Sequence, residues 1–394
     1  MIKFKTAESV RRGHPDKLCD LIADSVLDVC LAKDRSSRVA CEVMATKGRI
    51  IVAGEITCSE KIDIPLIVSR VLQKVGYNPK HYRVLVFVHQ QSTDIADGVD
   101  HALEQRNGDT TWYSAVGAGD QGTVYGYATN ETSKGIPLPL KLAHDICKRV
   151  DACMKDGSIK GLGPDGKAQV TLEYDGDTPK RVQSIVVSVQ HDAAKPTSVL
   201  RSEIISNVLW PVFEKMPFDD KTEILVNPSG RFVLGGPDAD TGVTGRKLMV
   251  DTYGGLAAHG GGAFSGKDPT KVDRSGAYMA RHIALHIVDS GFAKQCQVAI
   301  SYAIGKADPV ALEIDTFGTG KYSDEVLLKA VREVFNLRPA AIIEKLNLRS
   351  VKYSDFSCYG HFGNSFPSWE HTDKYRDFYD AVQKYAKEER DTHE

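Results

Sequence analysis

The stretch GGGAFSGKDPTKVDRSGAYMAR spans residues 260–281 and joins a glycine-rich loop to a segment with helical periodicity. Glycines let backbone amide groups approach a ligand, and Lys267 and Lys271 supply positive charge on the same loop. The apolar residues that follow share one helical face: Ala277, Ala280, Ile283, Ala284, Ile287 and Val288, with Gly291 as the stop signal. The sequence therefore predicts a polyphosphate-binding loop that leads into a helix.

The loop nearly matches the phosphate-binding loop of nucleoside triphosphatases. Gly261 is followed after four residues by Gly266 and Lys267, but Asp268 stands where a hydroxyl side chain would hold magnesium. A carboxylate cannot replace that hydroxyl unchanged, so this class of enzyme is disfavoured. For Asp273 two interpretations stay open, a ligand-binding carboxylate and the N-cap of the following helix.

Composition describes a globular chain without a strong overall charge. The 394 residues are 42% hydrophobic, and 50 lysines and arginines nearly balance 52 aspartates and glutamates. Nucleic acid and membranes are therefore not predicted partners, and local clusters must bind any anion. We find no signal-peptide core and no apolar run of roughly 18 residues, so we expect a cytoplasmic protein. The eight cysteines lack zinc-site spacing, which predicts free thiols.

Alternating strand and helix patterns recur three times along the chain. The first set comprises a helix after Pro15, strands at 38–44 and 50–56, a helix at 64–75 and a strand at 84–88. The second lies around 170–189 with a helix near 199–213, and the third starts at Val298 with a helix near 323–335. This pattern predicts three layered α+β units.

The region from Gln91 to Gly117 is rich in Asp, Thr, Gly and Asn and shows no sustained periodicity. It is longer than most connections inside a compact domain. Two interpretations stay open, a mobile cover over an active site and a plain surface loop.

The segment NPSGRFVLGGPDADTGVTGRK, residues 227–247, combines turn residues with cations. Phe232 could stack on a base, and Asp240 could bind a ribose hydroxyl or an ammonium group. Arg246 and Lys247 could bind phosphate oxygens. The alternative is a solvated hairpin with Phe232 in a core.

The motif GHPDK, residues 13–17, places His14 and Asp16 at the start of a predicted helix. His14 could donate to a developing oxyanion, and Asp16 could hold Mg²⁺ or simply favour the helix dipole. GAGDQG (117–122) and GPDGK (163–167) are equally typical of turns. The usual nucleophile and base motifs are missing, which suits a reaction whose nucleophile carries no proton.

Taken together, GHPDK, GAGDQG, NPSGRF, GPDADTGVTGRKLMVDTYGG and GGGAFSGKDPTKVDRS resemble the S-adenosylmethionine synthetase family from about Glu8 to Asp373. The resemblance implies methionine adenosyltransferase activity: the sulfur of methionine attacks ribose C5′ of ATP and expels tripolyphosphate, which is then cut to diphosphate and phosphate. It implies an α+β fold of three structurally similar α/β-sandwich domains with pseudo-threefold symmetry. The expected ranges are 1–101, 114–231 and 232–394, with 91–116 as a flexible active-site loop.

The same resemblance implies roles for individual residues. The catalytic positions are His14, Lys167, Arg246, Lys247, Lys267 and Lys271. The ATP-binding positions are His14, Asp165, Lys167, Arg231, Phe232, Asp240, Arg246, Lys247, Ala263 and Lys267. The methionine-binding positions are Glu55, Gln91, Asp120, Asp240 and Lys271. Glu55, and Glu42 as a metal ligand, are identified only through the resemblance, because their strand pattern does not single them out.

The implied cofactors are Mg²⁺, two ions per site on Asp16 and Asp273, and one K⁺ per site on Glu42. The implied partners are ATP, L-methionine and a second copy of the chain, in a homodimer with shared active sites that forms a homotetramer. Two alternatives are a non-catalytic regulatory paralogue of the same fold and another ATP-dependent transferase. The paralogue would be expected to lose His14, Lys267 or the aspartates, and all are present.

The chain departs from the family pattern at several positions. Gly163 stands where arginine is common, Arg11 and Arg12 precede GHPDK where an acidic residue is usual, and Asn364 follows YGHFG where arginine is common. The loop 91–116 is also longer than in many bacterial relatives. These departures concern substrate affinity and loop kinetics rather than the reaction.

Overall fold

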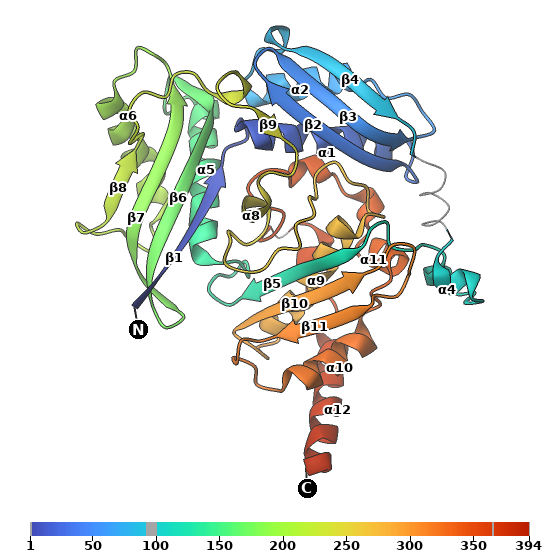
Figure 1. Ribbon diagram of the computed structural model, residues 1–394. Coiled ribbons are helices and arrows are strands. Elements are labelled where there is room, and N and C mark those ends of the chain that lie inside the picture. The colour runs from blue at the N-terminus through green and yellow to red at the C-terminus, as the bar shows by residue number, and fades with distance from the viewer. Residues whose placement is uncertain (1, 92–100, 365, 394) are drawn as a thin grey trace.

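Three β-sheets form the framework of the molecule (Figure 1). The computed structural model describes residues 2–91, 101–364 and 366–393. Within these residues the strand orders are β1-β6-β7-β8, β4-β3-β2-β9 and β11-β10-β5. The strands are β1 (Ile2–Val10), β2 (Arg38–Thr46), β3 (Arg49–Thr57), β4 (Arg83–His89), β5 (Gly122–Thr129), β6 (Leu162–Asp175), β7 (Thr178–His191), β8 (Glu223–Val226), β9 (Gly242–Val243), β10 (Gln295–Tyr302) and β11 (Ala311–Asp315).

Each sheet takes one strand from a distant part of the chain. β1 runs antiparallel to β6, with Val10 opposite Lys167. β5 runs antiparallel to β10, with Gly126 opposite Val298. The two-residue strand β9 pairs antiparallel with β2, where Val243 lies opposite Met44. The first third of the chain thus gives a strand to the second, the second to the last, and the last to the first.

This cyclic exchange agrees with the predicted three α+β units, but it crosses the sequence ranges 1–101, 114–231 and 232–394. Every sheet contains a strand from outside the range that supplies its other strands. The ranges stay predictions of domain limits. Physically, the exchange means that no sheet is complete without a second part of the chain.

One long helix packs on each sheet: α1 on β2, α5 on β1 and β6, and α9 on β5 and β10 (Figure 1). The helices are α1 (Pro15–Lys33), α2 (Ile64–Val75), α4 (Leu103–Arg106), α5 (Leu138–Asp156), α6 (Thr197–Ile204), α7 (Trp210–Val212), α8 (Leu248–Asp251), α9 (Val272–Asp289), α10 (Asp324–Val334), α11 (Pro339–Lys345) and α12 (Tyr375–His393). A π-helical turn at Ile205–Leu209 joins α6 to α7. Among the described helices we find none that combines the length and apolarity needed to cross a membrane.

The helix predicted after Pro15 is confirmed as α1. Pro15 occupies its first turn, where a missing backbone N–H costs nothing. Leu18, Ile22 and Val26 are fully buried and share a core with Val39 of β2. These residues fix the side of α1 that faces the sheet, so its opposite side is free to carry polar residues toward the loops of the last third.

The second half of the predicted loop 91–116 is anchored, whereas residues 92–100 lie outside the described part of the structure. The backbone N–H of Leu103 donates to the carbonyl of Gly305 at 2.9 Å. Glu104 accepts from the backbone N–H of Ala307 at 2.7 Å. Arg338 forms an ion pair of 3.0 Å with Asp109. Residues 101–116 are therefore attached to the C-terminal third of the chain.

We predict that Gly126→Ala destabilises the fold, because an added Cβ would overlap the backbone of Ala280 in α9. Overpacking of this kind costs about 1–3 kcal/mol, and a backbone neighbour cannot rotate away. Urea unfolding measures the change. Thr123→Ala on the same strand is the control, because it loses only a hydroxyl contact of 2.8 Å with Ser301. Equal stability of the two variants would contradict the close packing of α9 on β5.

Candidate active site

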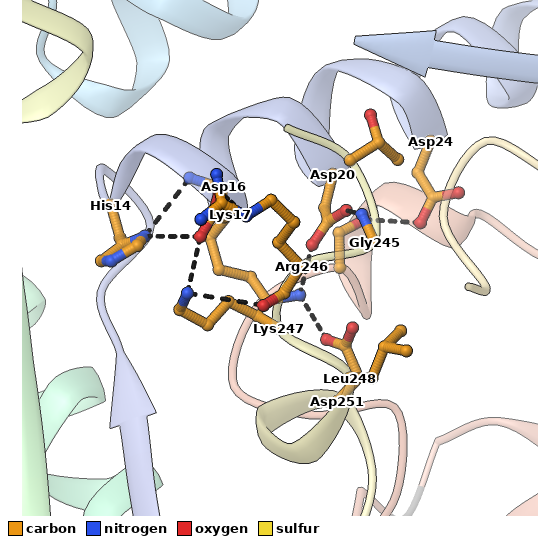
Figure 2. A network of polar contacts seen from close by, with 12 residues as sticks. His14, Asp16, Lys17, Asp20, Asp24, Gly245, Arg246, Lys247, Leu248 and Asp251 are labelled. Carbon is orange, nitrogen blue, oxygen red and sulfur yellow. Dashed lines mark hydrogen bonds and ion pairs between the residues drawn. The ribbon is translucent and has the colours of Figure 1, made fainter. Parts of the chain in front are cut away.

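The N-terminus of α1 forms one centre of the candidate site (Figure 2). His14 is the N-cap residue, and its Nδ1 accepts from the backbone N–H of Asp16 at 3.3 Å. Asp16 also accepts from Lys247 Nζ at 2.6 Å, and Arg246 Nε lies 3.9 Å from the same carboxylate. Four residues predicted from two separate motifs therefore meet at one helix end.

Asp16 and Asp20 hold the strand β9 and the turn after it against α1. The backbone N–H of Val243 donates to Asp16 at 3.0 Å, and that of Gly245 donates to Asp20 at 2.9 Å. The carboxylates are four residues apart and so lie on the same face of the helix. Arg246 and Lys247 follow immediately in sequence. These bonds therefore fix the backbone position from which their charged side chains extend.

Asp24 and Asp28 continue the same row along α1. Asp24 accepts from the backbone N–H of Gly266 at 2.9 Å, and Arg274 donates to both of its oxygens at 2.8 and 2.9 Å. Asp28 accepts from the backbone N–H of Tyr353 at 2.6 Å. We call Asp16, Asp20, Asp24 and Asp28 the carboxylate row. It attaches three separate loops to one helix.

A buried ammonium group lies beneath the row. Lys17 is fully buried and donates to Asp20 at 2.7 Å and to Asp251, the last residue of α8. Burial raises the pKa of Asp251 to about 7, against the opposing effect of Lys17. Burial alone would lower the pKa of Lys17, but the two carboxylates raise it far above its usual value. The pair of carboxylates therefore keeps this ammonium charged.

The glycine-rich loop forms the second centre. Lys267 forms an ion pair with Asp273, and its backbone lies beside Ala40 of β2 in an antiparallel bridge. Lys271 donates to the buried Asp268 at 2.7 Å, which keeps the pKa of this carboxyl low although burial alone would raise it. Asp268, the residue that disfavoured a P-loop, therefore fixes the side chain of Lys271 within the same loop.

The interpretation of Asp273 as a helix N-cap is wrong. Lys271 occupies the N-cap position of α9 and makes no side-chain cap bond, and Asp273 lies in the first turn. Its carboxylate turns to Lys267, and a Cβ on Gly262 would overlap that carboxylate. Gly262 is therefore required at this position because the loop backbone passes directly against Asp273.

His14 is neutral at physiological pH. Burial and, to a smaller extent, the nearby Lys247 lower its pKa to about 4. Because Nδ1 accepts from the N–H of Asp16, the proton of the neutral ring lies on Nε2. The charges of Lys167 and Asp240 also act on this ring, so residues of three predicted motifs surround it. His14 is arranged as a hydrogen-bond donor rather than as a cation.

The predicted ATP-binding positions differ in their surroundings. Asp165 is buried, with its two oxygens accepting from the N–H groups of Gly166 at 2.6 Å and Gly236 at 2.8 Å. Arg231, Lys167 and Asp240 are exposed, and Phe232 is half-buried rather than part of a core. Ala263 packs against the turn after β9, where an added Cβ on Gly245 would meet its methyl group at 2.7 Å.

The predicted methionine and K⁺ positions are divided: Lys271 belongs to the second centre and Asp240 lies near His14, whereas the others are on separate elements. Glu42 and Glu55 are on β2 and β3, and the Glu55 carboxylate lies 3.1 Å from Nε2 of His89. Burial raises the pKa of Glu42, and Lys267 opposes this shift. The backbone N–H of Gln91 donates to Thr57 at 3.4 Å, and Asp120 is exposed. Among the described residues, no hydrogen bond or ion pair joins Glu55, Gln91 or Asp120 to the two centres.

A histidine pair outside this region has the spacing of metal ligands. His282, His286 and Asp373 place ligand atoms within 4.8 Å of one another. However, Nδ1 of His286 contacts the carbonyl of His282 at 2.8 Å, and Nε2 accepts from the N–H of Lys374 at 3.0 Å. Both ring nitrogens of His286 are thus used, and we interpret the group as part of the C-terminal core.

The fold consists of three α+β units, and its site contains lysines that are paired with carboxylates. These features are typical of an enzyme that binds polyphosphates. Models for the N-terminal, central and C-terminal domains of S-adenosylmethionine synthetase match residues 3–95, 115–232 and 234–371. The chain belongs to the S-adenosylmethionine synthetase family. The family, the fold and the methionine adenosyltransferase function predicted from the motifs are confirmed.

Two curated relatives cover nearly the whole chain. This chain is 50% identical over 379 residues to the S-adenosylmethionine synthase of Desulforudis audaxviator (strain MP104C). The matched residues cover 94% of this chain and 96% of the relative. It is 46% identical over 391 residues to the S-adenosylmethionine synthase of Finegoldia magna (strain ATCC 29328 / DSM 20472 / WAL 2508), which covers 97% and 99%. The likeness therefore extends over all three sheets.

Several residues that organise the site were not singled out by the sequence. They are Lys17, Asp20, Asp24, Asp251 and Arg274. The available signal was a row of aspartates at four-residue spacing in α1, because a carboxylate repeated on one helical face needs partners there. Without the partner loops in view, that row is indistinguishable from the solvated face of an amphipathic helix.

We predict that Asp24→Asn lowers both stability and turnover. It leaves the buried Arg274 without its carboxylate, which typically costs about 3–5 kcal/mol, and it loosens the loop that carries Lys267. Asp28→Asn is the matched control, because it loses a bond to residues 353–354 and leaves the contact with Gly266 intact. Urea unfolding and steady-state kinetics separate the two. Equal loss of kcat in both variants would contradict a specific role for Asp24.

We predict that His14 titrates near pH 4 in the folded chain instead of near its usual pKa of 6.5. The unfolded chain takes up this proton first as pH falls below 6.5. The stability contributed by neutral His14 is therefore complete above pH 6.5 and is lost as pH falls toward 4. Imidazole NMR signals, assigned with His14→Asn, measure the titration. A midpoint near 6.5 would contradict the proposed neutral donor.

Proposed function

We propose that this chain forms S-adenosyl-L-methionine from ATP, L-methionine and water, with release of phosphate and diphosphate. The methionine sulfur attacks ribose C5′ in line, and tripolyphosphate leaves as one unit before it is hydrolysed. The proposal rests on one observation: two neighbouring loops each carry a lysine that is paired with a carboxylate. The pairs are Lys247 with Asp16 and Lys267 with Asp273. Such pairs offer cations for a polyphosphate and carboxylates for the metal that accompanies it.

The chemistry fits a site without a general base. A thioether sulfur attacks through a lone pair and has no proton to lose, so the protein must align the reactants and stabilise the leaving group. Alignment can contribute about 7–11 kcal/mol. We propose that His14 Nε2–H donates to the departing O5′, while Lys167, Arg246, Lys247, Lys267 and Lys271 stabilise the tripolyphosphate.

The carboxylates suit the proposed metals. Mg²⁺ prefers oxygen ligands, and Asp16 stays ionised because Lys247 and the N–H of Val243 lower its pKa against the effect of burial. We propose two Mg²⁺ ions per site, on Asp16 and Asp273, and one K⁺ on Glu42. The bound Mg²⁺ would neutralise phosphate charge. In the chain itself, Lys247 and Lys267 already balance these carboxylates.

We propose that Phe232, Arg231, Asp240 and Ala263 form the nucleoside side of the ATP site. Asp165 has its two oxygens bound to backbone amides, so we propose that it supports this side by holding the turn at Gly236. Methionine would be held by Glu55, Gln91, Asp120, Asp240 and Lys271. The loop 91–116 would cover the site, with residues 101–116 as its anchored end.

An uncovered sheet face supports a shared site. Met44 and Phe87 are 39% and 64% exposed on the sheet that contains β2, β3 and β4. Its opposite face is buried on α1 and α2 through residues such as Val43 and Ile50. Glu42 and Glu55 belong to the uncovered face, because they alternate with the buried residues. We propose that a second copy covers it in a homodimer with shared active sites, and that dimers form a homotetramer.

We also propose a cytoplasmic location. The eight cysteines are free thiols, as predicted, and seven of them are buried. Persistent disulfides are typical of oxidising compartments, so a chain with this many free thiols suits a reducing one.

The direct test is to incubate the purified chain with ATP, L-methionine, Mg²⁺ and K⁺ and to identify the products by mass spectrometry and phosphate assays. We expect the sulfonium product together with diphosphate and phosphate. ADP without a sulfonium product would indicate a phosphotransferase instead. No turnover by a folded dimer would indicate a non-catalytic paralogue.

We predict that Lys267→Ala lowers kcat at least about 100-fold, because removal of a single donor to a developing charge typically costs that much. The dimer should persist, because the substitution removes the ion pair with Asp273 and keeps the backbone bridge to Ala40 of β2. Lys47→Ala, at the exposed turn between β2 and β3, is the control for loss of one charge. Sedimentation and steady-state kinetics measure both effects, and an unchanged kcat would remove Lys267 from the mechanism.

A further inference from the structure

A cavity of about 460 Å³ lies behind the GHPDK turn, between the end of α2, the residues before α1, and α5. Its lining includes the basic residues Arg12, Lys74, Lys148 and Lys155. The volume is within the range of small-molecule sites, which is about 300–1,000 Å³. Its described lining residues include Gly13 but neither His14 nor Asp16.

The one carboxylate among its lining residues is already neutralised. Asp151 forms an ion pair of 2.7 Å with the buried Arg11 and also accepts from the hydroxyl of Tyr359. Arg11 in turn donates to the carbonyl of Gly163 at 2.6 Å. Asp151 therefore belongs to the wall of the cavity, where its charge also acts on Arg12 without forming an ion pair with it.

Within the described ranges, none of Arg12, Lys74, Lys148 or Lys155 forms an ion pair with a carboxylate. Asp145, one helical turn before Lys148 on α5, is paired with Lys141 at 2.6 Å. Uncompensated cations that share a concave surface repel one another and concentrate anions from solution.

Two of these cations flank one aromatic ring. The guanidinium of Arg12 lies 5.4 Å and the ammonium of Lys148 lies 5.7 Å from the centre of Tyr359. Burial lowers the pKa of Lys148, and the charges of Lys141, Lys134 and Arg12 lower it further against the effect of Asp145. Both residues also line the cavity, where an anion would relieve the repulsion between their positive groups.

We propose that this cavity binds an anion with two or more phosphoryl groups, at a site separate from the active site. Arg12 would give a planar, bidentate contact to phosphate oxygens, and the three lysines would act as point charges around it. A single phosphate would leave most of the four charges unmatched. The site does not depend on the proposed reaction, because none of its four cations belongs to the proposed catalytic set.

Calorimetric titration of the full chain with inorganic pyrophosphate tests the proposal. We expect two binding steps per chain in the wild type. Arg12→Gln combined with Lys148→Gln should weaken one step at least about tenfold and leave the other unchanged. Lys267→Ala should weaken the other step instead. Titration with ADP distinguishes the sources: binding of ADP at the Arg12-dependent step indicates a nucleotide site, and binding of pyrophosphate alone indicates an inorganic polyphosphate site.

Lys180→Gln combined with Lys221→Gln is the matched control, because it removes two charges from exposed positions outside the cavity. This control should retain both steps. Lys148→Gln alone provides a second, milder variant, and circular dichroism checks that each variant is folded. A single wild-type step that only Lys267→Ala weakens, or every step unchanged in the Arg12 and Lys148 variant, would overturn the proposal.

Discussion

The hydrogen bonds that the carboxylate row accepts from distant backbone amides are the interactions on which the site depends. Asp16, Asp20 and Asp24 accept from the N–H groups of Val243, Gly245 and Gly266, each within three residues of a proposed phosphate-binding cation. Bonds to ionised acceptors are about twice as strong as neutral ones, and a helix is a rigid support. The positions of the lysines are therefore set by α1, although the lysines belong to the last third of the chain.

The cyclic exchange of strands explains why the last third reaches α1 at all. β9 pairs with β2, and the bridge between Ala40 and Lys267 continues this contact at the same strand. Both pairings place loops of the last third across the face of α1 that is free of the core. Strand pairing thus brings these loops close to α1, and the hydrogen bonds of the carboxylate row then fix their conformation. Neither interaction alone would bring Lys247 and Lys267 to neighbouring positions.

The parts of this arrangement that depend on local periodicity could be predicted from the sequence. α1 follows from apolar residues at helical spacing and β2 and β3 from strand-like runs, and the motifs identified the family and its function. The exchange of β1, β5 and β9 could not be predicted, because each pairs with a strand remote in sequence and β9 has only two residues. Asp273 was open to a wrong interpretation, because a cap and an ion pair use the same residue type near a helix start.

The charge balance of the two centres has a consequence for how substrates would bind. Two of the lysines proposed to hold phosphate, Lys247 and Lys267, are each paired with a carboxylate proposed to hold Mg²⁺. A polyphosphate that bound alone would draw Lys247 and Lys267 away and leave Asp16 and Asp273 facing its negative oxygens. A metal that bound alone would leave two ammonium groups beside a cation. Because only the joint arrival of both keeps every charge paired, the geometry favours the metal–nucleotide complex as the species that enters.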